Sequence, residues 1–245
     1  MSERRSPPHV SPWGRLVLIC AAIVGACAVA LAIGALVTRT ERMVTGVVRG
    51  SLNGVSLDLG EANVEIIRGG NRESVELERT ERFTFDHGPV VERRIAGSTL
   101  RLRSRCPDTL LHTCSVDYRL IVPDNVPVQV KTESGGVRFE GYRGSVDVST
   151  DSGDVSVEGY CGFSLDVRTR TGDIDSAASC APQRLTLRST TGPIRSIVPP
   201  GRYRVDVEST SGRRLVRGVI AAEDAPYTIQ VLSTSGDVTL ESAEQ

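Results

Sequence analysis

The sequence predicts an all-β protein: a single-stack parallel β-solenoid, preceded by one transmembrane α-helix. Three observations predict it. A Ser-Gly or Thr-Gly pair recurs through the second half of the chain, apolar and polar residues alternate before each pair, and one long uncharged segment lies near the N-terminus. The repeated glycines stand 18 to 24 residues apart, at Gly135, Gly153, Gly172, Gly192, Gly212 and Gly236. A repeat of about 20 residues is typical of solenoids, so we expect coils of about 18–20 residues.

Each repeat contains a short strand with one buried face. The residues seven and five positions before each Gly are always apolar, and the residue between them is always polar. The apolar pairs are Val128 and Val130, Val146 and Val148, Leu165 and Val167, Leu185 and Leu187, Val205 and Val207, and Ile229 and Val231. This alternation predicts strands that pair in parallel between coils.

A second strand begins two residues after the Gly, where five copies carry an apolar residue: Val137, Val155, Ile174, Ile194 and Val238. The copy at Gly212 differs, because Arg214 holds this place and Leu215 follows it, which we interpret as a one-residue insertion. Each Gly is expected to form a corner with positive φ. The Ser and Thr hydroxyls beside it are expected to bond the nearby main chain.

The cysteines outside the uncharged segment form two predicted disulfides. Cys161 and Cys180 each lie eight residues after a repeat Gly, so they occupy the same slot on neighbouring coils. The coil spacing of about 4.8 Å lies within the Cα separation that a disulfide requires. Cys106 and Cys114 flank a turn-rich stretch and are expected to pair as well. Buried free thiols are the alternative, and two disulfides would indicate an oxidising compartment.

The uncharged segment runs for 22 residues, from Leu16 to Val37. That length spans a bilayer as one helix, and Arg4, Arg5 and Arg15 before it favour a cytoplasmic N-terminus with the C-terminal domain outside. The partner of this segment is thus the membrane, through residues 16–37. Two alternatives are a cleaved signal sequence and a lipoprotein processed at Cys27.

The chain divides into five parts. They are a disordered cytoplasmic tail (1–14), the transmembrane helix (15–38), a linker (39–46), a first coil with antiparallel hairpins (47–126) and the repeated coils (127–245). The first coil is expected around Gly60, between Val55–Leu59 and Val64–Ile67. The hairpin strands are expected at 75–85, 90–95, 100–103 and 116–122, and residues 241–245 are expected to close the far end.

Composition and motifs favour a function without catalysis. The net charge of −1 and an aromatic content of 4% do not match a nucleic-acid-binding surface. The three histidines are scattered, and no phosphate loop or nucleophile elbow is present, so we expect no enzyme, cofactor or metal site. Two alternatives involve acids. Asp154, Asp173 and Asp237 follow their Gly and would either bind calcium or cap turn N–H groups. Asp147 and Asp166 share an outward column and would serve either as a glycosidase pair or as solvated surface acids.

Four residues are candidates for surface binding. Arg168 and Arg188 share an outward column and would bind an anionic envelope polymer, or form a solvated ladder of charges. Tyr142 and Tyr160 occupy matching slots seven residues after their Gly. They would contact glycan rings if exposed, or pack over a coil corner if buried.

Three segments resemble the bacterial putative adhesin family: Val116–Pro123, Val128–Gly135 and Val146–Gly159. In that family a strand ending in Val-Pro leads into successive Thr-x-Ser-Gly-Asp-Val coils, and the likeness covers roughly residues 50–242. This chain departs from the pattern at Gly136, Pro193 and Arg213, where Asp would follow the Gly.

The resemblance implies a β-solenoid ectodomain on a membrane-anchored envelope protein, often of Gram-positive or actinobacterial lineages, and transfers no catalytic residue. We therefore expect a non-enzymatic, adhesin-like protein whose partner is a cell-envelope polymer or a membrane protein. One alternative is a sensor or accessory subunit of envelope-stress signalling, paired through the small-residue stripe at Ala22, Ala26, Ala30 and Gly34. A carbohydrate-active β-helix enzyme is a further alternative.

Overall fold

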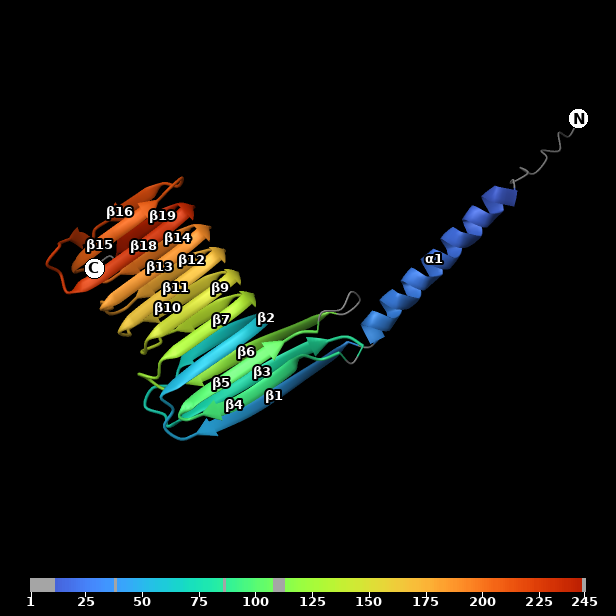
Figure 1. Cartoon of the computed structure of the whole chain (residues 1–245), viewed down its shortest axis with the longest axis horizontal. Helices are drawn as coiled ribbons and strands as arrows, with labels where there is room; N and C mark the ends of the chain where they lie inside the picture. The colour runs from blue at the N-terminus through green and yellow to red at the C-terminus, as the bar shows by residue number, and fades with distance from the viewer. Residues whose placement is uncertain (1–11, 38, 86, 108–112, 244–245) are drawn as a thin grey trace, which may run out of the picture.

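The structure is a computed structural model that describes residues 12–37, 39–85, 87–107 and 113–243. One helix, α1 (Pro12–Val37), extends away from a body of β-strands, at the end of the body where β1, β3 and β4 lie (Figure 1). Residues 12–14 were expected in the disordered tail, but they are helical. The remainder of that tail lies outside the described residues.

The repeats form the predicted parallel solenoid, with two strands in each coil. The first strands of the coils build sheet B: β7 (Val128–Ser134), β9 (Val146–Ser152), β11 (Ser164–Thr171), β13 (Arg184–Thr191), β15 (Arg202–Ser209) and β18 (Tyr227–Ser235). The second strands build sheet A: β8 (Val137–Glu140), β10 (Val155–Tyr160), β12 (Ile174–Ala178), β14 (Ile194–Val198), β16 (Arg214–Arg217) and β19 (Val238–Ser242). Strand pairing between these coils is parallel, and residues of the same column lie opposite one another.

The last two coils are stacked in the reverse of their chain order. Strand β18 pairs with β13 on one side and with β15 on the other, so Ile229 lies opposite both Leu185 and Val205. The coil β15–β16, followed by the short β17 (Ile220–Ala221), therefore forms the far end of the stack. The expectation that residues 241–245 close this end was wrong. Their coil lies one place further in, between the coil that contains β13 and the coil that contains β15.

The strand register also shows that the one-residue insertion expected near Gly212 is not present. Arg214 lies directly opposite Val238, so this coil keeps the common spacing and carries Arg in an otherwise apolar column.

The end of the body nearest α1 combines one complete coil with antiparallel strands. The first half of β2 (Gly54–Arg68) pairs with β5 (Thr99–Arg105) and β7 in sheet B, and its second half pairs with β6 (Cys114–Val122) and β8 in sheet A. The predicted first coil is thus present, but Ala62 rather than Gly60 stacks beneath Gly135.

Antiparallel pairing joins β1 (Thr40–Arg49) to β3 (Ser74–Phe83), β3 to β6, and β4 (Val90–Ala96) to β5. The expected linker, residues 39–46, is therefore largely part of strand β1. The expected hairpins are correct only in part, because β5 and β6 also pair with β2 in parallel.

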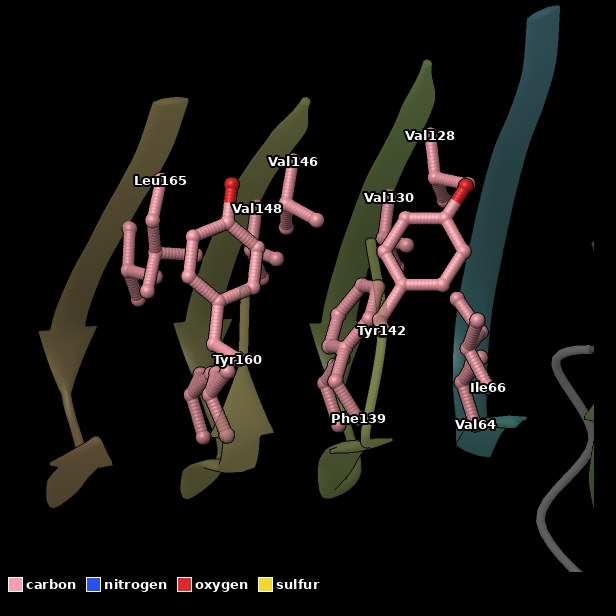
Figure 2. Packing of buried hydrophobic residues seen from close by; sticks show 14 of the residues in the cluster. Val64, Ile66, Val128, Val130, Phe139, Tyr142, Val146, Val148, Tyr160 and Leu165 are labelled. Atoms are coloured by element: carbon pink, nitrogen blue, oxygen red, sulfur yellow. The ribbon is translucent and has the colours of Figure 1, made fainter. Parts of the chain in front are cut away.

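The core is the space between the two sheets. The apolar columns predicted from the repeat point inward, and Val130, Val148, Val167, Leu187 and Val231 are fully buried. Figure 2 shows Val130 and Val148 on successive coils of this core, with Phe139 close to Val130. The hydroxyl column next to them is buried too, and Thr132 and Thr150 contact each other with their Oγ1 atoms 3.2 Å apart.

The glycine column has a stronger physical reason than the predicted positive φ. Only Gly135, Gly172 and Gly192 of the six have a positive φ in the left-handed range. At all six positions, however, a Cβ would overlap the main-chain oxygen of the residue stacked beneath it. Glycine is required because neighbouring backbones approach closely at the corner.

Both predicted disulfides are present. Cys161 joins Cys180 across adjacent coils with a Cα–Cα distance of 4.7 Å, and Cys106 joins Cys114 with a Cα–Cα distance of 5.8 Å. Cys20 and Cys27 lie on α1 as free cysteines.

Candidate functional site

The outward face of sheet B carries the two predicted arginines. Arg168 on β11 and Arg188 on β13 lie directly opposite each other on adjacent strands. Because side chains alternate along a strand and Val167 and Leu187 point into the core, both guanidinium groups project to the solvent side.

Both arginines are held by polar neighbours on the same face. The Arg168 guanidinium donates to Asp166 at 2.7 Å and lies 3.6 Å from the Asp147 carboxylate. The Arg188 guanidinium donates to the side-chain oxygen of Gln230 at 2.7 Å. We call these five residues the arginine ladder. It combines two arginines with two acids and one amide, so both guanidinium groups already have polar partners within the protein.

The two acids of the ladder are stacked on adjacent coils, with Asp147 directly opposite Asp166. Burial raises the pKa of Asp166, the Asp147 charge adds to this rise, and the Arg168 guanidinium opposes it. Both acids line a shallow hollow of about 400 Å³ together with Arg184 and Gln129. This arrangement offers hydrogen-bond donors and acceptors to a polar ligand.

Tyr142 and Tyr160 do not belong to this surface. Both are fully buried, and Figure 2 shows their rings inside the core between the valine columns. The Tyr142 hydroxyl donates to the main-chain oxygen of Val126, and the Tyr160 hydroxyl donates to that of Gly144 at 2.8 Å. They are packing residues, so the expectation that they contact glycan rings was wrong.

Two of the acids that follow the repeat glycines accept a hydrogen bond from the neighbouring coil. Asp154 Oδ1 accepts from the main-chain N–H of Asp173 at 2.9 Å, and Asp237 Oδ1 accepts from that of Arg213 at 2.9 Å. Asp173 faces Pro193 in the stack, which has no N–H to donate. Among the described residues, no group of three or more His, Cys, Asp or Glu is arranged to hold a metal ion.

A second hollow, of about 420 Å³, lies on the outward face of sheet A and was missed by sequence reasoning. Its lining includes Asn63, Asp117 and Asp154, which come from β2, β6 and the turn before β10. Asn63 donates to Asp117 at 2.8 Å, and Arg82 forms an ion pair with the same carboxylate. The sequence signal for this hollow was Gly136. It has no side chain, whereas the residues stacked on either side of it are Asn63 and Asp154.

The model of the Toastrack DUF4097 family matches residues 111–241, which is more than half of the chain. The chain belongs to the Toastrack DUF4097 family. The matched segment covers strands β6 to β19 and therefore every repeated coil. The helix α1 and strands β1 to β5 precede it, although β2 supplies a full coil of the Toastrack body.

Solved structures of adhesin-like proteins resemble the chain at low identity. A putative cell adhesion protein from Clostridium sporogenes is 10% identical with a TM-score of 0.47, over 83% of this chain and 100% of the other. A putative adhesin from Bacteroides fragilis is 14% identical with a TM-score of 0.43, over 83% of this chain and 98% of the other. A search of curated proteins found no match.

Proposed function

We propose that this Toastrack protein is a non-enzymatic, membrane-anchored, adhesin-like solenoid that binds or organises cell-envelope material. The observation that carries the proposal is that an exposed, apolar helix, α1, precedes a disulfide-bonded β body. Residues Trp13–Gly34 have a mean hydropathy of 2.9, and none of the most apolar stretch is buried inside the structure. The body that follows contains two disulfides, which is typical of an exported domain.

The proposed orientation places the N-terminus in the cytoplasm and the β body outside. Arg4 and Arg5 precede the span and Arg15 lies close to its start, and the positive-inside rule favours their retention in the cytoplasm. An uncleaved anchor would leave the mature chain at its full 26.3 kDa, whereas lipoprotein processing at Cys27 would remove the first 26 residues. Intact-mass measurement of the protein from purified membranes separates the two.

The proposed binding surface is the arginine ladder on sheet B. A polymer that runs along the stack meets a new coil about every 4.8 Å, and two adjacent coils present Arg168 and Arg188 in the same outward column. Arg168 is 45% exposed despite its two acidic neighbours, so its guanidinium can exchange an intramolecular partner for an anionic group of the polymer. Such a surface provides many weak contacts along a rigid scaffold and no enclosed reaction site.

Retention of solubilised envelope fractions on the immobilised protein tests the proposal, with wall polymer and membrane proteins assayed separately. We expect polymer retention by the wild type and a several-fold loss in Arg168→Ala/Arg188→Ala. Arg195→Ala/Arg217→Ala is the matched control, because these arginines lie on sheet A and pair with Glu241. Equal loss in both double variants would remove the ladder from the proposal.

Retention of one membrane protein and no polymer would favour the alternative function, an accessory or sensor subunit of an envelope signalling system. Turnover of a cell-wall glycan that is abolished in Asp166→Asn would contradict the non-enzymatic assignment.

A further inference from the structure

The loop between β3 and β4 brings an aromatic ring to the end of the membrane helix. Strand β1 starts at Thr40, shortly after α1 ends, and Thr40 lies opposite Phe83 at the end of β3. The residues that follow Phe83 are therefore next to the point where the chain leaves the helix. Phe85 lies in this loop, and its ring contacts the helix at Gly34: a Cβ there would lie 3.5 Å from Cε1 of Phe85.

The position of Gly34 fixes the depth of this ring. Gly34 lies near the end of the uncharged segment Leu16–Val37, three residues before α1 ends at Val37. At 1.5 Å per residue, this segment is about 32 Å long, close to the thickness of about 30 Å of a bilayer's hydrocarbon core. A ring at the level of Gly34 would therefore lie at the outer edge of the hydrocarbon and below the headgroups.

The loop holds Phe85 in a conformation that its own side chain disfavours. Its φ is 56°, which is unusual for a bulky residue. The base of the loop is fixed to the disulfide-bonded strand end: the Thr84 N–H donates to the Thr113 oxygen at 3.1 Å, and the Thr113 N–H donates to Thr84 Oγ1 at 3.2 Å. Thr84 is itself buried. The body thus presents the ring toward the helix on a constrained turn.

We propose that Phe85 inserts into the outer interface of the bilayer and holds the β body against the membrane surface beside its own anchor. The occupant of this docking surface is lipid, at the boundary between headgroups and acyl chains, where aromatic side chains partition favourably. Val90, at the start of β4, adds a second apolar side chain to the loop and is 65% exposed. The inference rests on the proposed membrane anchor.

Fluorescence of a single tryptophan at position 85 tests the insertion. Trp13 is the chain's only tryptophan, so the full-length protein carries Trp13→Phe together with Phe85→Trp. In phosphatidylcholine vesicles we expect blue-shifted emission, at least twofold quenching by lipids brominated on the acyl chain, and weak quenching by iodide. The control is Phe163→Trp in the same background, because Phe163 is 62% exposed and lies far from the β3–β4 loop. It directly precedes β11, and strands β2, β7 and β9 separate β11 from β5 in sheet B. Its emission should be quenched by iodide and not by brominated lipid.

Water-like emission from the Phe85→Trp protein, with no quenching by brominated lipid, would overturn the inference. Flotation of the same vesicles in high salt tests the anchor separately. Failure to float refutes the anchor, whereas flotation without quenching by brominated lipid refutes only the insertion.

A second variant covers the case in which tryptophan at position 85 disturbs folding. Asn tolerates a positive φ, so Phe85→Asn keeps the turn and removes the ring. We expect trypsin to cleave the reconstituted variant after Arg39 several-fold faster than wild type, because the junction with β1 is no longer held at the bilayer. An unchanged cleavage rate would count against the insertion.

Discussion

Arg214 donates a hydrogen bond from Nη1 to the main-chain oxygen of Val207 at a distance of 3.1 Å. Arg214 lies on β16 in sheet A and Val207 on β15 in sheet B, so this bond joins the two sheets at the last coil. The column that contains Arg214 is apolar in the coils beneath it. A charged residue therefore covers the end of the core where no further coil stacks.

This arrangement predicts that Arg214→Val makes the protein self-associate. Val205 and Val207 are only partly buried in the end coil, and Val216 is 46% exposed. An inward-pointing charge at an edge strand opposes edge-to-edge pairing, so its removal leaves a continuous apolar end. Sedimentation velocity should show a monomer for the wild type and dimers or larger species for the variant.

Arg217→Val is the matched control for this experiment. It removes a charge from the same strand, but Arg217 points outward, where its guanidinium lies 3.7 Å from the Glu241 carboxylate. Self-association of both variants to the same extent would show that charge alone, and not the position of Arg214, keeps the ends apart.

The glycine column allows the cost of close stacking to be measured apart from the cost of a positive φ. Gly153 has no φ in the left-handed range, but a Cβ there would overlap the Gly135 oxygen. Gly70 has a φ of 64°, and a Cβ added there would have no neighbouring atom within 4 Å. We expect Gly153→Ala to lower the free energy of unfolding by about 3 kcal/mol through overpacking, and Gly70→Ala by about 1 kcal/mol through its φ.

Urea unfolding of the full-length protein in mild detergent gives both values. A smaller loss for Gly153→Ala than for Gly70→Ala would mean that the coils separate easily, and that the column is glycine for conformational reasons.

The repeat pattern was sufficient to predict the solenoid, its inward columns and the Cys161–Cys180 disulfide. These features depend only on the spacing within and between neighbouring coils. The reversed order of the last two coils could not be predicted, because Val205 and Ile229 belong to the same column and fit either place. Two signals were present: a longer interval of 24 residues between Gly212 and Gly236, and the charge at Arg214.

The candidate site was harder to predict than the fold. The outward direction of Arg168 follows from alternation alone, so it could be read from the sequence. The burial of Tyr142 depends on the space at the turn between two strands, which accommodates the whole ring. The spacing of residues in the repeat does not show how large that space is. The hollow on sheet A needs β6 beside β2, a pairing between strands that are separated by three others in the chain.

The Cys161–Cys180 disulfide is expected to stabilise the stack chiefly through the unfolded state. The two residues are 19 apart in sequence, and a loop of this size corresponds to about 3 kcal/mol of lost chain entropy. Cys161→Ala/Cys180→Ala should therefore lower the free energy of unfolding by about this amount. Reduction of the Cys106→Ala/Cys114→Ala variant, which retains only this disulfide, should produce the same loss. A loss below about 1 kcal/mol in both would show that the parallel ladders already order this region without it.

Two aspartates of the same column should respond to pH with opposite signs. Desolvation, followed by the charges of Asp154 and Asp175, raises the pKa of Asp173. Hydrogen bonds from the main chain and then the side chain of Arg213 lower the pKa of Asp237. The ionised form of Asp173 therefore opposes folding above its raised pKa. The ionised form of Asp237 favours folding above the ordinary pKa of Asp, and this contribution is lost as the pH falls through the lowered value.

At pH 7 we accordingly expect Asp173→Asn to be more stable than the wild type and Asp237→Asn to be less stable. Both differences should shrink at about pH 3, below the ordinary pKa of about 3.9 for Asp. Urea unfolding of the three proteins at the two pH values provides the measurement. Pro193→Ala is a further check, because it restores an N–H opposite Asp173 and should reduce the advantage of Asp173→Asn. An advantage that is the same at both pH values would show that the carboxylate charge at Asp173 is not its source.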